Sequence, residues 1–405
     1  MDAPRPTVAE VFRSFQAAYL ENYPASAQQR RVLRAVVLCK TAALGGHKAQ
    51  CDQCGHAEIF YNSCRNRHCP KCQGAARAEW LRQRSSELLD TPYFHVVFTL
   101  PEALGPLALQ NQRRVYELLF HAAADTLLAI AGDPKHLGAE IGFLAVLHTW
   151  GQTLEHHPHL HCVVPGGGLA ADHSRWIPAR RSFFLPVRVL SQVFRGKFLA
   201  YLRRAYEQGS LNFHGQLENL EHPVEWTAFV RGLAGRPWVV YSKPPFGGPE
   251  QVLKYLARYT HRVAISDQRL VSLDDGKVTF RYKDYRCGDV ERTMTLDATE
   301  FIRRFLQHVL PASFHRIRYY GFLANRVRQE SLALARRLLG SAPTEPTKPP
   351  PESPDSPAEP ASAESSFKDS LCPACKKGRL VLVERLQPDS TVRNALLPPA
   401  GNDTS

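Results

Sequence analysis

The sequence lacks three features that would place it in large classes of protein. Its 405 residues contain no run of eighteen apolar residues, so we expect no membrane span. The segment 1–12 does not join a basic stretch to an apolar one, as a secretory signal would. No G-x-x-x-x-G-K-[ST] motif is present, so we expect no P-loop helicase in the chain. These absences favour a cytoplasmic protein with no membrane partner.

Acidic residues are also in short supply. The chain has 38 Asp and Glu residues against 51 Lys and Arg, which gives a formal net charge of +13 and a pI near 9.4. Such a balance favours a polyanionic partner, most simply nucleic acid, and a place at the nucleoid. A basic protein that is merely soluble is the alternative. The length allows roughly two to three domains.

Cysteine, by contrast, is concentrated in one part of the chain. Most of the ten cysteines lie between Cys39 and Cys72. In a chain without an export signal, this clustering favours metal thiolates in a reducing cytosol over disulfides. The two C-x-x-C pairs, Cys51 with Cys54 and Cys69 with Cys72, predict one tetrahedral zinc site made of four thiolates.

The segment between these pairs carries further candidates. Cys64 and His68 are alternative zinc ligands, and free structural thiols are a further alternative. Arg65 and Arg67 lie in the same segment with little acid to offset them, so we predict that they contact DNA. A solvated basic face is the alternative. Because apolar spacing also predicts helices over 8–20 and 27–39, we interpret residues 1–90 as a helical and zinc-binding DNA-recognition module.

A histidine-rich motif, HHPHLHCVV, runs from His156 to Val164. It begins like a turn and ends like a strand. His159 and His161 are two residues apart, so on a strand both side chains leave the same face. Two imidazoles on one face can bind a divalent metal ion. A surface cluster, or a pair of histidines satisfied within the core, is the alternative.

A third metal ligand is expected from the preceding strand. Residues 141–150 predict a strand, and a turn connects it to the histidine motif as a hairpin-like pair. His148 would lie opposite the histidine pair, while Glu155 and His157 are the competing ligands. A metal ion with three protein ligands keeps coordination positions open for a substrate oxygen.

A pair of tyrosines follows about a hundred residues later. Pro249 with an acidic residue after it predicts the start of a helix, on which Tyr255 and Tyr259 stand one above the other. A phenol is a weak nucleophile at neutral pH, but a metal that polarises a scissile phosphate makes its attack feasible. An aromatic pair in a core is the alternative. The cations predicted on the same helix, which would bind DNA, are Lys254, Arg258 and Arg262.

Three segments, in this order, resemble those of a known family. They are NSCRNRHCPKC at 62–72, HPHLH at 157–161 and YLARY at 255–259. The chain resembles the two-tyrosine rolling-circle insertion-sequence transposases of the HUH endonuclease superfamily, with an N-terminal transposase zinc-binding domain. The resemblance covers about residues 10–335.

The resemblance implies roles for individual residues. His159 and His161 would hold a catalytic magnesium or manganese ion, in addition to the structural zinc. Tyr255 and Tyr259 would be the nucleophiles. His148 is not carried over in the same way, because the third ligand varies across the superfamily.

The resemblance also implies a fold and a reaction. The fold is α+β, a mainly antiparallel sheet flanked by helices, over residues 91–340. The reaction is cleavage and rejoining of single-stranded DNA at element ends and target through a 5′-phosphotyrosine. Because the chain shows no P-loop, host replication machinery or a helicase is an expected partner. A plasmid replication initiator or relaxase, and a non-catalytic zinc DNA-binding regulator, are the alternatives.

The C-terminal part begins with a hairpin and ends in a segment of different composition. Residues 269–282 predict a hairpin around an Asp-Gly turn. Residues 341–370 are rich in Pro, Ser, Glu and Ala and predict a disordered linker. The tail at 371–405 contains a lone C-x-x-C pair, Cys372 with Cys375. No second pair follows, so the tail has either lost a zinc knuckle or borrows ligands from elsewhere. We expect the first.

Overall fold

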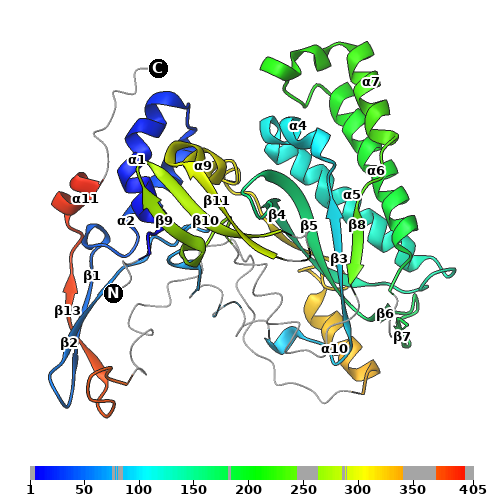
Figure 1. Ribbon diagram of the computed structural model, residues 1–405. Coiled ribbons are helices and arrows are strands. Elements are labelled where there is room, and N and C mark those ends of the chain that lie inside the picture. The colour runs from blue at the N-terminus through cyan, green and yellow to red at the C-terminus, as the bar shows by residue number, and fades with distance from the viewer. Residues whose placement is uncertain are drawn as a thin grey trace.

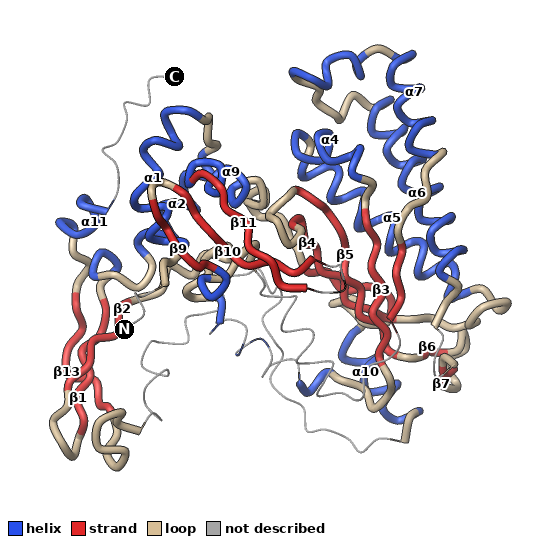
Figure 2. Tube along the Cα trace, in the orientation of Figure 1, coloured by secondary structure: helices blue, strands red, loops and turns tan. Residues whose placement is uncertain are grey.

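The computed structural model has a mixed α+β architecture with antiparallel sheets, which confirms the predicted fold class (Figure 1). The structure describes residues 5–74, 78, 80, 85–180, 184–243, 263–284, 288, 290–340 and 371–396. The predicted linker, 341–370, lies outside the described residues. Figure 2 shows the three larger sheets at separate places across the molecule.

A five-stranded sheet forms the centre, in the order β12-β4-β5-β3-β8, and every neighbouring pair is antiparallel. The apolar runs of β4 and β5 suit strands in the middle of a sheet, because both of their faces are covered. All nine residues of β4 are buried. The strands are β3 (Tyr93–Thr99), β4 (Gly142–Trp150), β5 (His156–Pro165), β8 (Val240–Lys243) and β12 (Ile317–Gly321).

Helices cover one face of this sheet, at the right of Figure 1. Alternate strand residues, such as Phe98, Leu147 and Leu160, pack with these helices in the largest core. Because strand side chains alternate, the residues between them point to the opposite face, which carries the histidines. The helices are α4 (Gly105–Gln110), α5 (Gln112–Gly132), α6 (Val187–Glu207) and α7 (Pro223–Ala234).

Helix α5 is long and apolar enough to cross a membrane by length and composition alone. Its most apolar window is 67% buried inside the protein, however, as expected for the core helix of a globular domain.

The N-terminal helices form a second core with a three-stranded sheet and α9. Thr7 and Ser26 each begin a helix with a capping box, where the predicted helices over 8–20 and 27–39 begin. Phe12 meets Phe305 edge to face across this core. The elements are α1 (Val8–Asn22), α2 (Ala27–Leu38), β9 (Leu270–Asp274), β10 (Lys277–Asp284), β11 (Val290–Asp297) and α9 (Ala298–Leu306).

A smaller sheet joins the two ends of the sequence, at the left of Figure 1. Strand β1 (Gly46–Cys51) lies between β2 (Ala57–Tyr61) and β13 (Leu380–Leu386), and both pairs are antiparallel. After β13 the tail continues into α11 (Ser390–Leu396). The tail therefore packs on the N-terminal module.

The remaining elements are peripheral. Helix α10 (Arg328–Leu338) follows β12, and β6 (Gly167–Leu169) pairs with β7 (Trp176–Pro178) in a two-stranded sheet. Short 3-10 turns are η1 (Ala42–Leu44), η2 (Ser85–Glu87), η3 (Glu102–Leu104), η4 (Gly215–Glu221) and η5 (Asp267–Arg269).

Candidate functional site

Three histidines meet on the sheet face that lies opposite α5 and α6. His148 on β4 is the register partner of His159 on β5, and His161 lies two residues further along the same strand. The candidate ligand nitrogens of His148, His159 and His161 all lie within 4.8 Å of one another. Below we call these three residues the histidine site. The structure thus brings together the two motif histidines and the one expected from the neighbouring strand.

Hydrogen bonds fix the orientation of two of these rings. Nδ1 of His159 lies 2.7 Å from the carbonyl oxygen of His157, so Nδ1 carries the proton and the lone pair is on Nε2. Nδ1 of His161 lies 2.8 Å from Nε2 of His95, a buried histidine on β3. Burial, with a smaller effect from Lys243 and His159, lowers the pKa of His95 to about 3. A neutral His95 can accept the Nδ1 proton of His161, which leaves Nε2 of His161 as a ligand atom.

The two competing ligands lie outside the histidine site. Glu155 and His157 line the surrounding groove, but neither belongs to the three-histidine group. His156 points elsewhere, since its Nε2 lies 2.8 Å from the hydroxyl of Tyr116 in the core.

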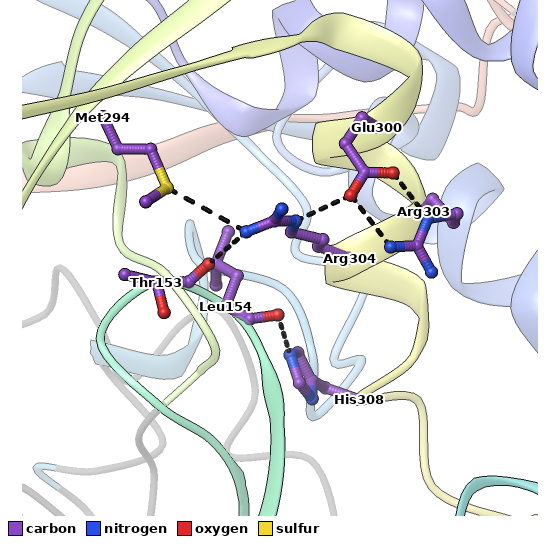
Figure 3. Close-up of polar contacts among 7 residues, drawn as sticks. All are labelled: Thr153, Leu154, Met294, Glu300, Arg303, Arg304 and His308. Atoms are coloured by element: carbon purple, nitrogen blue, oxygen red, sulfur yellow. Dashed lines mark hydrogen bonds and ion pairs between the residues drawn. The ribbon is translucent and has the colours of Figure 1, made fainter. Parts of the chain in front are cut away.

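Helix α9 and the residues after it hold the turn that connects β4 to β5 (Figure 3). Arg304 donates to the carbonyl oxygen of Thr153 at 3.2 Å and to Glu300 at 2.7 Å. The buried ring of His308 bridges the two sides of the turn: Nε2 donates to the carbonyl oxygen of Leu154 at 3.1 Å, and Nδ1 lies 3.2 Å from Oγ1 of Thr149. Since this turn sets the pairing register between β4 and β5, these contacts help to position His148 opposite His159.

A groove of about 670 Å³ opens over the histidine site. It lies between the central sheet and the end of β10, and aromatic and cationic side chains both line it. Asp284 lies at the edge of the groove and forms an ion pair with Arg292 at 3.2 Å, which offsets the negative charge of Asp284. The aromatic and cationic residues of the lining are Trp150, Tyr241, Tyr282, Lys243 and Lys283.

The predicted nucleophiles lie outside the described residues. The segment 244–262 contains Tyr255 and Tyr259 and, with them, Lys254, Arg258 and Arg262. The described chain reaches this segment at Lys243, the register partner of His95 on the adjoining strand. The described chain before this segment therefore ends beside His95, whose ring contacts His161 of the histidine site.

The predicted zinc site is wrong in its composition. Cys69 and Cys72 do not share a site with Cys51 and Cys54, because these cysteines belong to two separate groups of four. The first cysteine tetrad is Cys39, Cys64, Cys69 and Cys72, and the second is Cys51, Cys54, Cys372 and Cys375. The expectation that the tail has lost a zinc knuckle is also wrong, since its C-x-x-C pair meets the first C-x-x-C pair of the sequence.

The first cysteine tetrad has the chemistry of a metal site. Sγ of Cys64 lies 3.8 Å from Sγ of Cys72, and the ligand sulfurs lie within 4.8 Å of one another. A hydrogen bond between the sulfurs of Cys39 and Cys64 lowers the pKa of Cys39 and raises that of Cys64. His68 is not a member: its buried ring accepts from the backbone N–H of Leu310.

The two arginines predicted to contact DNA differ in their surroundings. Arg65 is exposed and has a positive φ of 54°. Arg67 is half-buried, and its guanidinium donates to the carbonyl oxygens of Phe314 and Pro311 at 2.6 and 3.0 Å. Arg67 therefore ties the zinc-binding segment to the chain that leads into β12, while its DNA contact stays a prediction.

Sequence reasoning missed the roles of four residues in these sites. Cys39 has no C-x-x-C partner, and His95 sits in a strand with no motif around it. Cys372 and Cys375 carry a clear knuckle pattern, but their partners lie at the other end of the sequence. The crowding of cysteines after residue 39 was the one signal that pointed to Cys39.

Two family descriptions match the chain. Residues 11–100 match a transposase zinc-binding domain, and residues 142–331 match the Y2 family described as a putative transposase. A putative transposase named y4qJ, from Sinorhizobium fredii (strain NBRC 101917 / NGR234), is 56% identical over 381 residues, which cover 94% of this chain and 95% of the relative.

The chain belongs to the Y2 transposases of the IS91/IS801 family. A more distant relative is the transposase for insertion sequence element IS801 from Pseudomonas savastanoi pv. phaseolicola, 31% identical over 299 residues, 72% of this chain and 69% of the relative. No solved structure matches. The zinc-binding domain and the cysteine tetrads of this transposase indicate zinc as a structural metal, and its family implies that it binds DNA.

Proposed function

We propose that this transposase cleaves and rejoins single-stranded DNA at the ends of its element through a 5′-phosphotyrosine intermediate. The observation that carries the proposal is the histidine site: three imidazoles from adjacent strands, with their ligand nitrogens within 4.8 Å, facing an open groove. The proposed nucleophiles are Tyr255 and Tyr259, which follow the strand that ends beside His95.

The residues of the histidine site fit a divalent metal ion. His148, His159 and His161 would hold it, and the three-ligand set leaves positions for phosphate oxygens. Bound there, the ion would polarise the scissile phosphate and stabilise the charge that develops on it. Because imidazole is a softer donor than carboxylate, we expect manganese to bind more tightly than magnesium.

The proposed reaction is a phosphoryl transfer that conserves the number of phosphodiester bonds. The phenolic oxygen of one tyrosine attacks phosphorus, the bond to the 3′ oxygen breaks, and that oxygen takes up a proton. The 5′ phosphate is now esterified to the tyrosine. In the second step a free 3′ hydroxyl of the target attacks this ester, and the tyrosine regains its proton. Two tyrosines allow one strand to be held while another is cut.

The groove suits the substrate class. Trp150, Tyr241 and Tyr282 offer faces on which unpaired bases can stack, and Lys243 and Lys283 can bind backbone phosphates. We infer that the transposase works at the nucleoid, with host replication proteins or a helicase supplying the single strands.

A cleavage assay tests the proposal. Labelled single strands from both ends of the element are incubated with the full chain, with and without manganese, and run on a denaturing gel. We expect a metal-dependent protein–DNA adduct, lost in the Tyr255→Phe/Tyr259→Phe double variant and in His159→Ala. His156→Phe is the matched control, because it removes a half-buried histidine of the same strand that is outside the histidine site. Binding without any adduct in the wild-type protein would favour a non-catalytic zinc DNA-binding regulator.

A further inference from the structure

The second cysteine tetrad joins two parts of the chain that are far apart in sequence. Cys51 and Cys54 come from the turn between β1 and β2, and Cys372 and Cys375 come from the turn before β13. We propose that this tetrad binds a second zinc ion, separate from that of the first tetrad. This ion would hold the C-terminal tail against the N-terminal module.

The distances between the sulfurs match a tetrahedral zinc site. Sγ of Cys51 lies 3.7 Å from Sγ of Cys375, and Sγ of Cys54 lies 3.7 Å from Sγ of Cys372. Four sulfurs about 2.3 Å from a central ion stand about 3.8 Å apart. A disulfide would need the sulfurs at about 2.0 Å. The spacing therefore leaves room for an ion between the thiols.

Backbone N–H groups point at the sulfurs, as thiolates require. The N–H groups of Gln53 and Cys54 donate to Sγ of Cys51 at 3.4 and 3.5 Å, and that of Gly378 donates to Sγ of Cys375 at 3.3 Å. Such bonds favour the charged form of the sulfur, which is the form that binds zinc. In this way both C-x-x-C turns carry donors for a metal-bound thiolate.

The two turns have the same construction. Gly55 and Lys376 each follow the second cysteine of their turn, with φ values of 72° and 58°. The N–H of Gly55 donates to the carbonyl oxygen of Cys51, and that of Lys376 donates to that of Cys372. Two matching knuckles that face each other supply two sulfurs each, which is a complete four-thiolate set.

The apolar core around the second cysteine tetrad is small. Within the described chain, the buried residues of this cluster are Ala49, Cys51, Cys372 and Leu380. Zinc can replace such a core, because binding of the metal stabilises the folded arrangement. The tail then completes the sheet on β1 and extends to α1, where the side-chain amide of Gln16 donates to the carbonyl oxygen of Leu396. The zinc-binding part of this chain thus extends beyond residues 11–100.

Zinc content of the purified full chain is the direct test, and it does not depend on DNA cleavage. We expect the Cys372→Ser/Cys375→Ser variant to hold one zinc ion fewer per chain than the wild type, both carrying His159→Ala so that the histidine site adds no zinc. In that background the expected contents are two ions and one. Cys162→Ser is the matched control, since Cys162 is a buried cysteine outside both tetrads, and it should retain two. Equal zinc contents with and without the two tail cysteines would overturn the proposal.

A second variant keeps all four ligands in place. A Cβ atom at Gly378 would stand 2.5 Å from Sγ of Cys51 and from Oδ1 of Asp52. Gly378→Val should therefore weaken one zinc site and leave the other, so that a chelating dye removes one ion much faster than from the wild type. Equal release from both proteins would count against the site.

Cutting the chain tests whether zinc holds the tail on the rest of the protein. A protease site inserted within 341–370 allows the tail to be severed after folding. With zinc bound, the severed tail should elute with the body of the protein in gel filtration. In the Cys372→Ser/Cys375→Ser variant it should separate. Retention of the severed tail by that variant would show that strand pairing alone holds it.

Discussion

Nε2 of His95 lies 2.8 Å from Nδ1 of His161, and the planes of the two rings are nearly parallel, 7° apart. His95 lies on β3 and His161 on β5, so the contact crosses between neighbouring strands. It holds the ring of His161 in the orientation that leaves Nε2 as the ligand atom beside His148 and His159. A histidine outside the metal-binding group thus positions one that would bind the metal.

Loss of this contact should weaken metal binding. We expect His95→Phe to raise the dissociation constant for manganese by about 10- to 100-fold, as is typical when the hydrogen-bonding partner of a metal-binding histidine is removed. Titration followed by electron paramagnetic resonance measures it. His156→Phe should leave the constant unchanged, and an unchanged constant in His95→Phe would show that the contact has no such role.

The composition of the first cysteine tetrad is tested by two neighbouring residues. Cys64→Ser should lose one zinc ion per chain, because a ligand sulfur is removed. His68→Gln should keep both ions, since His68 lies outside the tetrad and bonds to the backbone of Leu310. Zinc analysis of the purified variants gives the answer, and zinc loss in His68→Gln would restore His68 as a ligand.

Arg67 should act on stability. Removing a guanidinium that serves two backbone carbonyls should cost about 2 kcal/mol or more in Arg67→Ala, since bonds from a charged donor are strong and the carbonyls lose their partner. Urea denaturation measures the loss. Arg67→Lys keeps the charge but not the forked geometry, so it should recover little of the stability. Full recovery by lysine would mean that charge alone matters.

Arg65, in contrast, should act on DNA. Arg65→Ala should leave the urea midpoint unchanged and weaken DNA binding, with the slope of affinity against salt reduced by about one. Fluorescence anisotropy at several salt concentrations measures this slope. Unchanged affinity and slope would place Arg65 outside the interface.

Glu300 should give stability that depends on pH. Hydrogen bonds from Arg303 and then Arg304 lower the pKa of Glu300 to about 2. A lowered folded-state pKa stabilises the fold above the unfolded value of about 4.3, and this contribution is lost as pH falls toward 2. We expect Glu300→Gln to cost about 1 kcal/mol at pH 7, because the site is partly exposed to solvent.

The measurement for Glu300 is a difference between two proteins. The urea midpoints of the wild type and Glu300→Gln are compared at pH 7 and at successive values below about pH 4.3, the unfolded pKa. Zinc release in acid affects both proteins, so the gap between them isolates the carboxylate. A gap that stays constant as the pH falls would contradict the prediction.

Local pattern was sufficient to predict the histidine site. Strand periodicity puts His159 and His161 on one face, and a hairpin with a short turn brings His148 opposite them. Every residue of that argument lies in one short stretch of the chain. The Asp275-Gly276 turn between β9 and β10 was predictable for the same reason, and both of its residues have positive φ.

Long-range pairing was not predictable in the same way. A C-x-x-C pair determines that two sulfurs face one ion, but it does not say which other pair completes the set. Cys51 and Cys54 therefore fitted Cys69 and Cys72 as well as they fitted Cys372 and Cys375. The role of His95 could not be predicted for a related reason. It depends on β3 lying beside β5, and no local sequence pattern indicates that pairing.

The most direct test of the proposed chemistry is to locate the covalent bond. The adduct formed with manganese and a single-stranded element end is digested with nuclease and protease, and the modified peptide is sequenced by mass spectrometry. We predict a nucleotide attached through its 5′ phosphate to Tyr255 or Tyr259. Attachment to any other residue, or cleaved DNA with no protein attached at any time in the reaction, would contradict it.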